Sequence, residues 1–104
     1  MKRYKVVITA SALQDMEELY NYIANELYSP NTAKKIYLKI ANAVQSLEFF
    51  AERYKVFYSE ESSLVRRMLV GNYSVFYTVQ DDFVKVTRVI YSSRDLGERL
   101  KGKN

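Results

Sequence analysis

The 104-residue sequence contains no cysteine and no histidine, and it has only one proline. Without cysteine it can form neither a disulfide nor a thiolate zinc site. Without histidine it lacks the side chain that most often carries protons near neutral pH. It also lacks any apolar run near the roughly 18 residues of a membrane helix, and no apolar signal segment follows Met1. We therefore expect one soluble cytoplasmic domain spanning residues 1–104, with no membrane contact, cofactor or metal.

Positive charge is modest overall but concentrated near the C-terminus. The net charge is +4. Residues 88–104 carry five basic side chains against two acidic ones, a local balance of +3, and residues 95–104 form a basic tail. Such clustering favours an anionic partner, either nucleic acid or an acidic protein, although a solvated tail is an equally simple interpretation. The basic residues that we predict to bind a target are Arg66, Arg88, Arg99 and Lys101.

The first half of the chain has the pattern of one strand and two helices. Residues 4–8 (YKVVI) are β-branched and favour a strand at or near a sheet edge. Apolar residues then recur every three or four positions to residue 27, which predicts a helix capped by Thr9, or by Ser11 in a capping-box spacing with Gln14. A second amphipathic helix is expected after Ser29, its predicted cap, with Pro30 at its first position.

The second half changes to the period of two that is typical of strands. Residues 51–63 show no periodicity, and we expect an exposed loop there. Residues 64–70, 74–79 and 83–90 predict strands joined by hairpin turns at 71–72 and 81–82. The element order is therefore β-α-α-β-β-β. It predicts a two-layer α+β domain in which a helical hairpin packs on an antiparallel sheet.

Arginines within the predicted strands need partners or a solvent-facing position. Adjacent strand residues point to opposite faces, so either Arg66 or Arg67 must lie nearer the helices. Strict alternation places Arg88 on the core face with Val84, Val86 and Ile90. Either a bulge redirects Arg88, or its guanidinium reaches an acidic helix residue such as Glu17 or Glu18.

Three strings carry a family resemblance that spans nearly the whole chain. They are VVITASALQDMEELYNYIANEL (6–27), VRRMLVGNYSVFYTV (65–79) and RVIYSSRD (88–95). In this order they resemble the opening strand and helix, the central hairpin and the ending of the ParE/RelE superfamily of bacterial toxins. The resemblance implies a growth-inhibiting toxin from a type II toxin-antitoxin module, neutralised by an antitoxin encoded beside it. Operator DNA would be contacted only through that antitoxin.

The superfamily divides into RelE-like members, which cleave messenger RNA in the ribosome, and ParE-like members, which inhibit DNA gyrase. By resemblance, Arg67 and Arg94 match two RelE cations, whereas Ser74 replaces an arginine and Leu100 falls near the late RelE tyrosine. Tyr91 stands where many relatives have histidine. If the protein is a nuclease, we predict Arg67, Tyr91 and Arg94 as its catalytic residues.

Three functions follow from this comparison. Two of the four RelE catalytic positions are not matched in this sequence, which favours a ParE-like toxin that binds a large target such as DNA gyrase. The first alternative is a RelE-like endoribonuclease acting on ribosome-bound messenger RNA. The second is a degenerate toxin retained as a binding module or co-repressor with its antitoxin.

Overall fold

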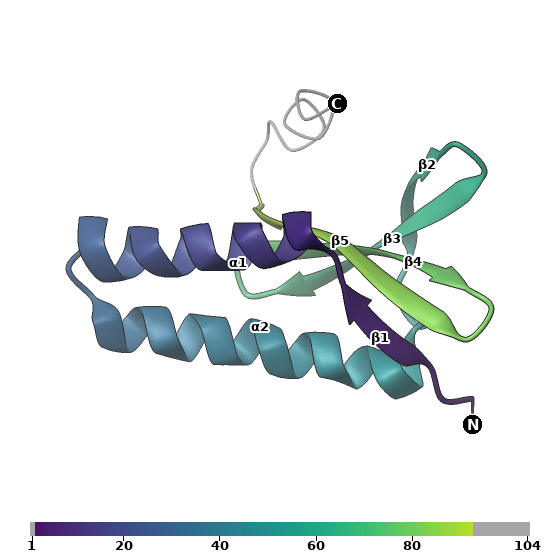
Figure 1. Ribbon diagram of the computed structural model, residues 1–104, viewed down its shortest axis with the longest axis horizontal. Coiled ribbons are helices and arrows are strands. Elements are labelled where there is room, and N and C mark those ends of the chain that lie inside the picture. Colours follow the sequence, from purple (N-terminus) through teal and green to yellow (C-terminus); the bar gives the residue numbers. More distant parts are fainter. Residues whose placement is uncertain (1, 93–104) are drawn as a thin grey trace.

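Two helices cover one face of a five-stranded sheet in the computed structural model, which describes residues 2–92 (Figure 1). The strands are β1 (Lys5–Ile8), β2 (Val56–Glu60), β3 (Ser63–Val70), β4 (Tyr73–Gln80) and β5 (Phe83–Tyr91). The helices are α1 (Ala10–Asn21) and α2 (Pro30–Phe50), and a π-helical turn, η1 (Tyr22–Glu26), continues α1. The spatial order is β1-β5-β4-β3-β2, with β1 parallel to β5 and all other pairs antiparallel. The predicted two-layer α+β class is confirmed.

Both helix starts lie close to their predicted positions. Thr9 caps α1, and its hydroxyl accepts a hydrogen bond from the amide of the third helical residue at 3.2 Å. Of the two predicted caps, Thr9 is therefore the correct one; Ser11 lies inside the helix, and the side chain of Gln14 donates to a glutamate one turn later. Ser29 occupies the cap position of α2, but its hydroxyl donates to the carbonyl of Leu27 instead of capping the helix.

The main core lies between the helices and the sheet. Its apolar side chains come from both layers, and its methionine and large aliphatic members other than Val70 are each at most 3% exposed. They are Met16, Ile40, Val44 and Leu47 from the helices, with Met68, Val75, Val84, Val86 and Val89 from the sheet. Burial of side chains this large contributes about 1.5–3 kcal/mol each before conformational entropy is subtracted.

The predicted loop at residues 51–63 is wrong for its second half, because β2 forms there and pairs with β3. The two strands are joined by Glu61 and Ser62, whose φ angles are 49° and 53°. Positive φ at both central residues is the geometry of a type I′ hairpin turn, which usually carries asparagine and glycine. Because Glu61 and Ser62 are not typical of such a turn, the sequence did not predict this hairpin. The predicted three-stranded meander is a four-stranded one, with β2 at its outer edge.

A bulge in β5 changes which side chains face the helices. Val86 lies opposite Tyr77, whereas Arg88 lies opposite Phe76, which leaves Thr87 as the extra residue. Beyond the bulge the alternation is reversed, so the next valine joins the main core and the isoleucine after it joins a cluster with Phe76 on the other face. Strict alternation, which placed Arg88 and that isoleucine on the core face, is therefore wrong from this point onward.

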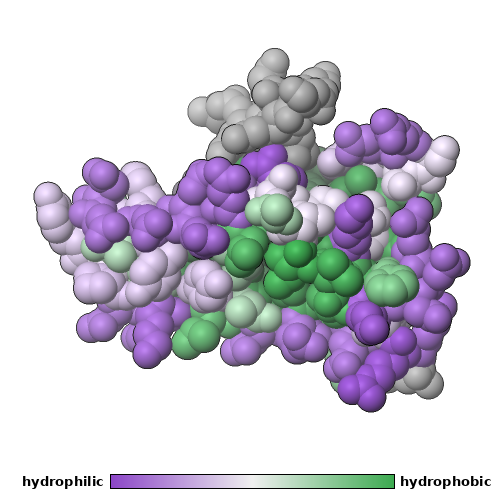
Figure 2. All heavy atoms as spheres, in the orientation of Figure 1, coloured by the Kyte–Doolittle hydropathy of each residue, from purple (hydrophilic) through white to green (hydrophobic). Residues whose placement is uncertain are grey.

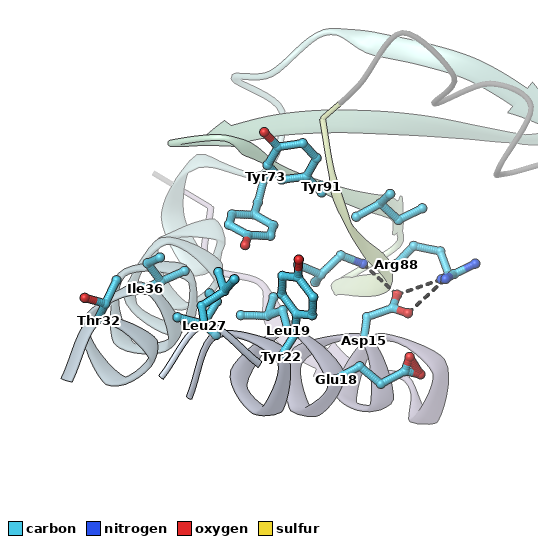
Figure 3. Close-up of a pocket in the computed structure, with 13 residues that line it drawn as sticks. Asp15, Glu18, Leu19, Tyr22, Leu27, Thr32, Ile36, Tyr73, Arg88 and Tyr91 are labelled. Atoms are coloured by element: carbon cyan, nitrogen blue, oxygen red, sulfur yellow. Dashed lines mark hydrogen bonds and ion pairs between the residues drawn. The ribbon is translucent and has the colours of Figure 1, made fainter. Parts of the chain in front are cut away.

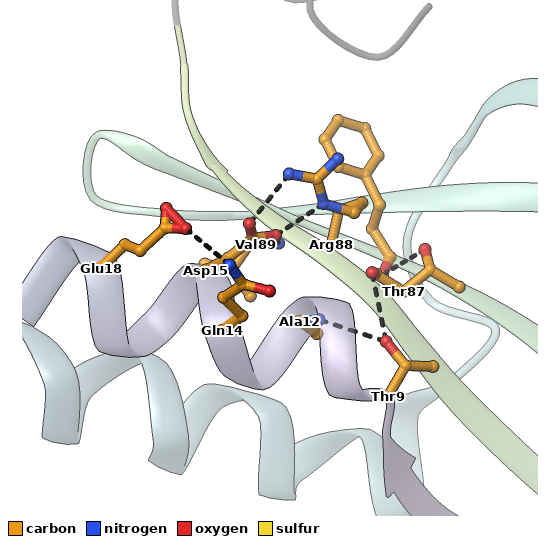
Figure 4. Close-up of polar contacts among 9 residues, drawn as sticks. Thr9, Ala12, Gln14, Asp15, Glu18, Thr87, Arg88 and Val89 are labelled. Carbon is orange, nitrogen blue, oxygen red and sulfur yellow. Dashed lines mark hydrogen bonds and ion pairs between the residues drawn. The ribbon is translucent and has the colours of Figure 1, made fainter. Parts of the chain in front are cut away.

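Arg88 forms the expected ion pair, but with a different carboxylate (Figure 4). Its Nε and Nη2 donate to the two oxygens of Asp15 at 2.7 and 2.8 Å, where Glu17 and Glu18 were the predicted partners. The same carboxylate accepts the backbone N–H of Val89 at 2.9 Å. Because β1 ends before this part of β5, Asp15 supplies the acceptor that a neighbouring strand would otherwise provide.

Tyr77 provides a test of how the sheet is anchored to α2. Its fully buried hydroxyl donates to the carbonyl of Ala51 at 2.7 Å, so Tyr77→Phe leaves that acceptor unsatisfied and should cost about 1–3 kcal/mol. Burial raises the pKa of Tyr77 above its ordinary value of 10.0. The stabilisation is therefore complete below about pH 10 and is lost as the pH rises further, by up to about 1.4 kcal/mol per unit.

Urea denaturation of the wild type and Tyr77→Phe at several alkaline pH values measures this effect. The wild-type free energy of unfolding should fall more steeply above pH 10 than that of the variant. Parallel curves for the two proteins would contradict the assignment.

Candidate functional site

We define the outer face as the face of the sheet opposite the helices. The register places Arg67, Phe76 and Arg88 side by side in one row of this face. The neighbouring row holds Ser74, which lies opposite Ile90. In the described part of the chain both helices lie on the other side of the sheet.

Arg67 is held in a defined orientation on the outer face. Its Nε donates to the hydroxyl of Ser74 at 2.9 Å, and the Ser74 and Ser92 hydroxyls are hydrogen-bonded at 2.6 Å. The guanidinium carbon lies 5.0 Å from the centre of the Phe57 ring, within the range of a cation–π interaction. Among residues 2–92, the two terminal nitrogens of Arg67 have no hydrogen-bond partner. We call Arg67, Ser74, Ser92 and Phe57 the arginine cluster.

Aromatic rings from β2 and β4 form a wall beside the arginine cluster. Phe57 and Tyr58 both pack on the buried ring of Phe76, with centroid distances of 5.4 and 6.3 Å. A register irregularity in β2 between Val56 and Tyr58 allows two consecutive side chains to reach the same ring. Burial, followed by the nearby charge of Glu60, raises the pKa of Tyr58, so its phenol stays protonated at neutral pH.

The structure separates two of the predicted catalytic residues. Tyr91 lies opposite Tyr73 on the helix-facing side of the sheet, with a ring-centroid distance of 5.6 Å. Arg67 and Tyr91 therefore leave the sheet from opposite faces. The predicted site residues Arg94, Arg99 and Lys101 lie, with the rest of the basic tail, outside the described residues.

Arg66 and Arg88 both have internal partners. Arg66 is the arginine of its pair that points toward the helices, where its Nη1 donates to the carbonyls of Tyr54 at 2.6 Å and Glu52 at 3.4 Å, just beyond the end of α2. Arg88 is held by Asp15, and this bond raises its pKa above the ordinary value. Their predicted role in binding a target stays a prediction.

A second candidate site, which we call the helical pocket, opens between the helices and the ends of β4 and β5 (Figure 3). Its volume is about 570 Å³. Apolar side chains line most of it, and the Asp15–Arg88 pair lies at one end. On the helical side, the apolar residues are Leu19 of α1, Tyr22 and Ile23 of η1, Leu27 directly after η1, and Ile36 of α2. Sequence reasoning missed this pocket because its apolar residues have the same helical spacing as core residues.

Toxin-antitoxin complexes of known structure share this architecture. The chain is similar to a chain of the chromosomal ParDE system from P. aeruginosa, with a TM-score of 0.74 and 20% identity over 88% of this chain and 98% of the other. An archaeal RelE-RelB complex from Pyrococcus horikoshii gives 0.64 and 18% over 88% and 98%. The complex RelBE2 from Mycobacterium tuberculosis gives 0.56 and 21% over 86% and 99%. These likenesses show that the chain has the fold of this class of toxins.

The family follows from the sequence itself. Residues 6–96 match the family model described as the ParE toxin of the type II toxin-antitoxin system parDE. The chain therefore belongs to the ParE toxin family, as the three strings indicated. A search of curated proteins finds no match.

Neither helix in the described part of the chain is long and apolar enough to cross a membrane. Residues 2–92 also contain no group of three or more acidic or other metal-ligating side chains that could hold a metal ion. The arginine cluster offers one positive charge, two hydroxyls and an aromatic surface. These groups are suited to binding an anionic or planar partner group.

Proposed function

We propose that this protein is the growth-inhibiting toxin of a type II toxin-antitoxin module and acts in the ParE-like manner, by binding and disabling a large target such as DNA gyrase. The observation that carries this proposal is the composition of the arginine cluster. Arg67 lies among hydroxyl groups and aromatic rings on the outer face, while Tyr91 lies on the other side of the sheet.

Binding fits this surface better than RNA cleavage does. Cleavage needs a base to activate the 2′-hydroxyl and an acid to protonate the leaving oxygen. The chain has no histidine, and the phenol beside the cluster, Tyr58, holds its proton more firmly than an exposed tyrosine because it is partly buried. Within the described residues, the cluster offers positive charge and hydrogen bonds without a group suited to moving protons at neutral pH.

One observation favours the alternative, a RelE-like endoribonuclease. Phe57 is 41% exposed and lies beside the Arg67 guanidinium. An exposed ring next to a cation is a common platform for a nucleic-acid base. A direct test on cellular messenger RNA is therefore needed.

Expression of the protein without its antitoxin, followed by primer extension on several abundant messages, distinguishes these functions. We expect growth to stop without new 5′ ends in the messages. New ends that appear before growth stops would establish the nuclease alternative. Unaffected growth at a verified protein level would instead favour a binding module or co-repressor.

We further propose that an antitoxin segment covers the helical pocket and the apolar edge of the sheet. Figure 2 shows an apolar area where Figure 1 places β1 and the parts of the helices beside it, and Val7 and Ile8 of β1 are 40% and 42% exposed. Exposed apolar surface of this kind is typical of protein-binding sites. An amphipathic segment that folds on binding would cover both the pocket and the strand edge.

Replacement of Leu27 by aspartate tests this placement. Leu27 lines the helical pocket and is 52% exposed, so Leu27→Asp should leave the fold intact and weaken antitoxin binding by about tenfold or more, through lost apolar contact and a buried charge. Leu38→Asp is a matched control, because Leu38 is 48% exposed on α2 and does not line the pocket. Calorimetry with the protein encoded by the adjacent reading frame measures both affinities. Equal affinities for the two variants would contradict the placement.

A further inference from the structure

Apart from the tyrosines, Ser74 is the one residue with a polar side chain that is buried in the described part of the chain, and it is 0% exposed. A buried hydroxyl is costly unless it is hydrogen-bonded. Ser74 meets this requirement by accepting from the Nε of Arg67 and by sharing a hydrogen bond with the hydroxyl of Ser92. The two serines therefore form a fixed support beneath the guanidinium.

The bulge in β5 is what brings Ser92 to this position. Strict alternation from Val86 would point Ser92 toward the helices, whereas the extra residue Thr87 reverses the alternation and turns it to the outer face. The backbone N–H of Ser92 also donates to the carbonyl of Asn72 at 2.8 Å, which fixes this end of the strand. The backbone path of β5 therefore places the Ser92 hydroxyl beside Ser74, and the two hydroxyls together hold the Arg67 side chain.

Among residues 2–92, the orientation of Arg67 leaves the two terminal nitrogens of its guanidinium for a ligand. The Nε is occupied by Ser74, and one side of the group faces the Phe57 ring. The two terminal nitrogens form a planar fork, whose geometry matches the two oxygens of a carboxylate or phosphate.

We propose that Arg67, oriented by Ser74, Ser92 and Phe57, is a receiving site for the carboxylate of one acidic side chain on a protein partner. The inference rests on the proposed function, because it assigns the chemistry by which the outer face holds its partner. Arg67 and Arg88 lie in the same row of the outer face, and the charge of Arg88 is already paired with Asp15. Among residues 2–92, Arg67 is thus the one arginine of this row without a carboxylate partner. One such arginine beside aromatic rings suits one carboxylate, whereas the phosphates of an RNA strand favour several adjacent cations.

The test uses the full-length protein labelled with nitrogen-15, in which the arginine Nε–H signals report on the side chains directly. Arg67→Lys identifies the Arg67 signal by its disappearance. The probe is a short, end-capped peptide of alternating glutamate and alanine, and a uridine oligonucleotide of the same length is the comparison. The peptide should shift the Arg67 signal, and Ser74→Ala should weaken its binding about tenfold, the effect of one lost hydrogen bond to a charged group.

Three further variants distinguish a role in positioning Arg67 from a role in the stability of the fold. Thr78→Ala removes a hydroxyl from the same face of the same strand and should leave peptide binding unchanged. Ser92→Ala should weaken binding as Ser74→Ala does, and Ser92→Thr, which retains the hydroxyl, should restore it. The proposal is overturned if the peptide leaves the Arg67 signal unmoved, if the oligonucleotide binds more tightly than the peptide, or if Ser74→Ala binds like the wild type. Because none of these readouts requires growth inhibition, failure of the proposed function is detected separately.

Discussion

Arg67→Ala should abolish growth inhibition at an expression level where the wild type stops growth. Truncation of one member of a buried, hydrogen-bonded charge pair at an interface costs about 2–5 kcal/mol, which corresponds to at least about thirtyfold in affinity. The fold should survive, because Ser74 keeps the hydroxyl of Ser92 as a hydrogen-bond partner when the guanidinium is removed. Far-ultraviolet circular dichroism should therefore be unchanged. The sequence predicts the same relief of toxicity for Arg94→Ala.

Lys85→Ala provides the matched control for Arg67→Ala. Lys85 is an exposed cation of β5 that lies opposite Thr78, in a different row of the sheet from Arg67. Growth inhibition by this variant should match that of the wild type. If Arg67→Ala still stops growth at equal expression, the assignment of the arginine cluster to target binding fails.

Asp15→Ala should produce the largest loss of stability among the substitutions considered. The Asp15 and Arg88 side chains are only 13% and 16% exposed, and the carboxylate accepts bonds from the guanidinium and from the Val89 amide. Removal of one member of such a buried pair leaves an uncompensated charge and costs about 3–5 kcal/mol. Urea denaturation at neutral pH measures this difference in the free energy of unfolding.

Two controls show whether the stability lost in Asp15→Ala comes from the broken ion pair with Arg88. Glu17→Ala changes an exposed carboxylate on the same helix and should alter stability by less than about 0.5 kcal/mol. The double variant Asp15→Leu with Arg88→Met should be more stable than Asp15→Leu alone, because it removes the unpaired charge. A cost below about 1 kcal/mol for Asp15→Ala would show that the pair is not needed to hold α1 against β5.

Local sequence patterns predicted most of the fold. The strand at the N-terminus, both helices and the last three strands lie within a few residues of their predicted positions. The strand β2 was missed because its hairpin turn uses Glu61 and Ser62, residues that seldom adopt positive φ. The partner of Arg88 was predicted to be a carboxylate of the first helix, but Asp15 could be distinguished from its neighbours only once the path of α1 past β5 was known.

The candidate site was predictable in part. The family resemblance indicated Arg67 as a site residue. It identified Ser74 only as a position where a RelE arginine is replaced. The structure shows that Ser74 is instead a buried hydrogen-bond partner of Arg67. Nothing in the sequence signals that Ser92 joins them, because its orientation depends on one extra residue in β5. A single bulge reverses every later side chain of a strand, and an alternating pattern does not reveal where it occurs.

The most direct test of the central claim is a supercoiling reaction with purified protein, relaxed plasmid and the DNA gyrase of the same host. The wild type should inhibit supercoiling in proportion to its concentration, and Arg67→Ala at the same concentrations should leave the reaction unaffected. Full supercoiling in the presence of wild-type protein that stops growth in cells would contradict the proposal that gyrase is the target.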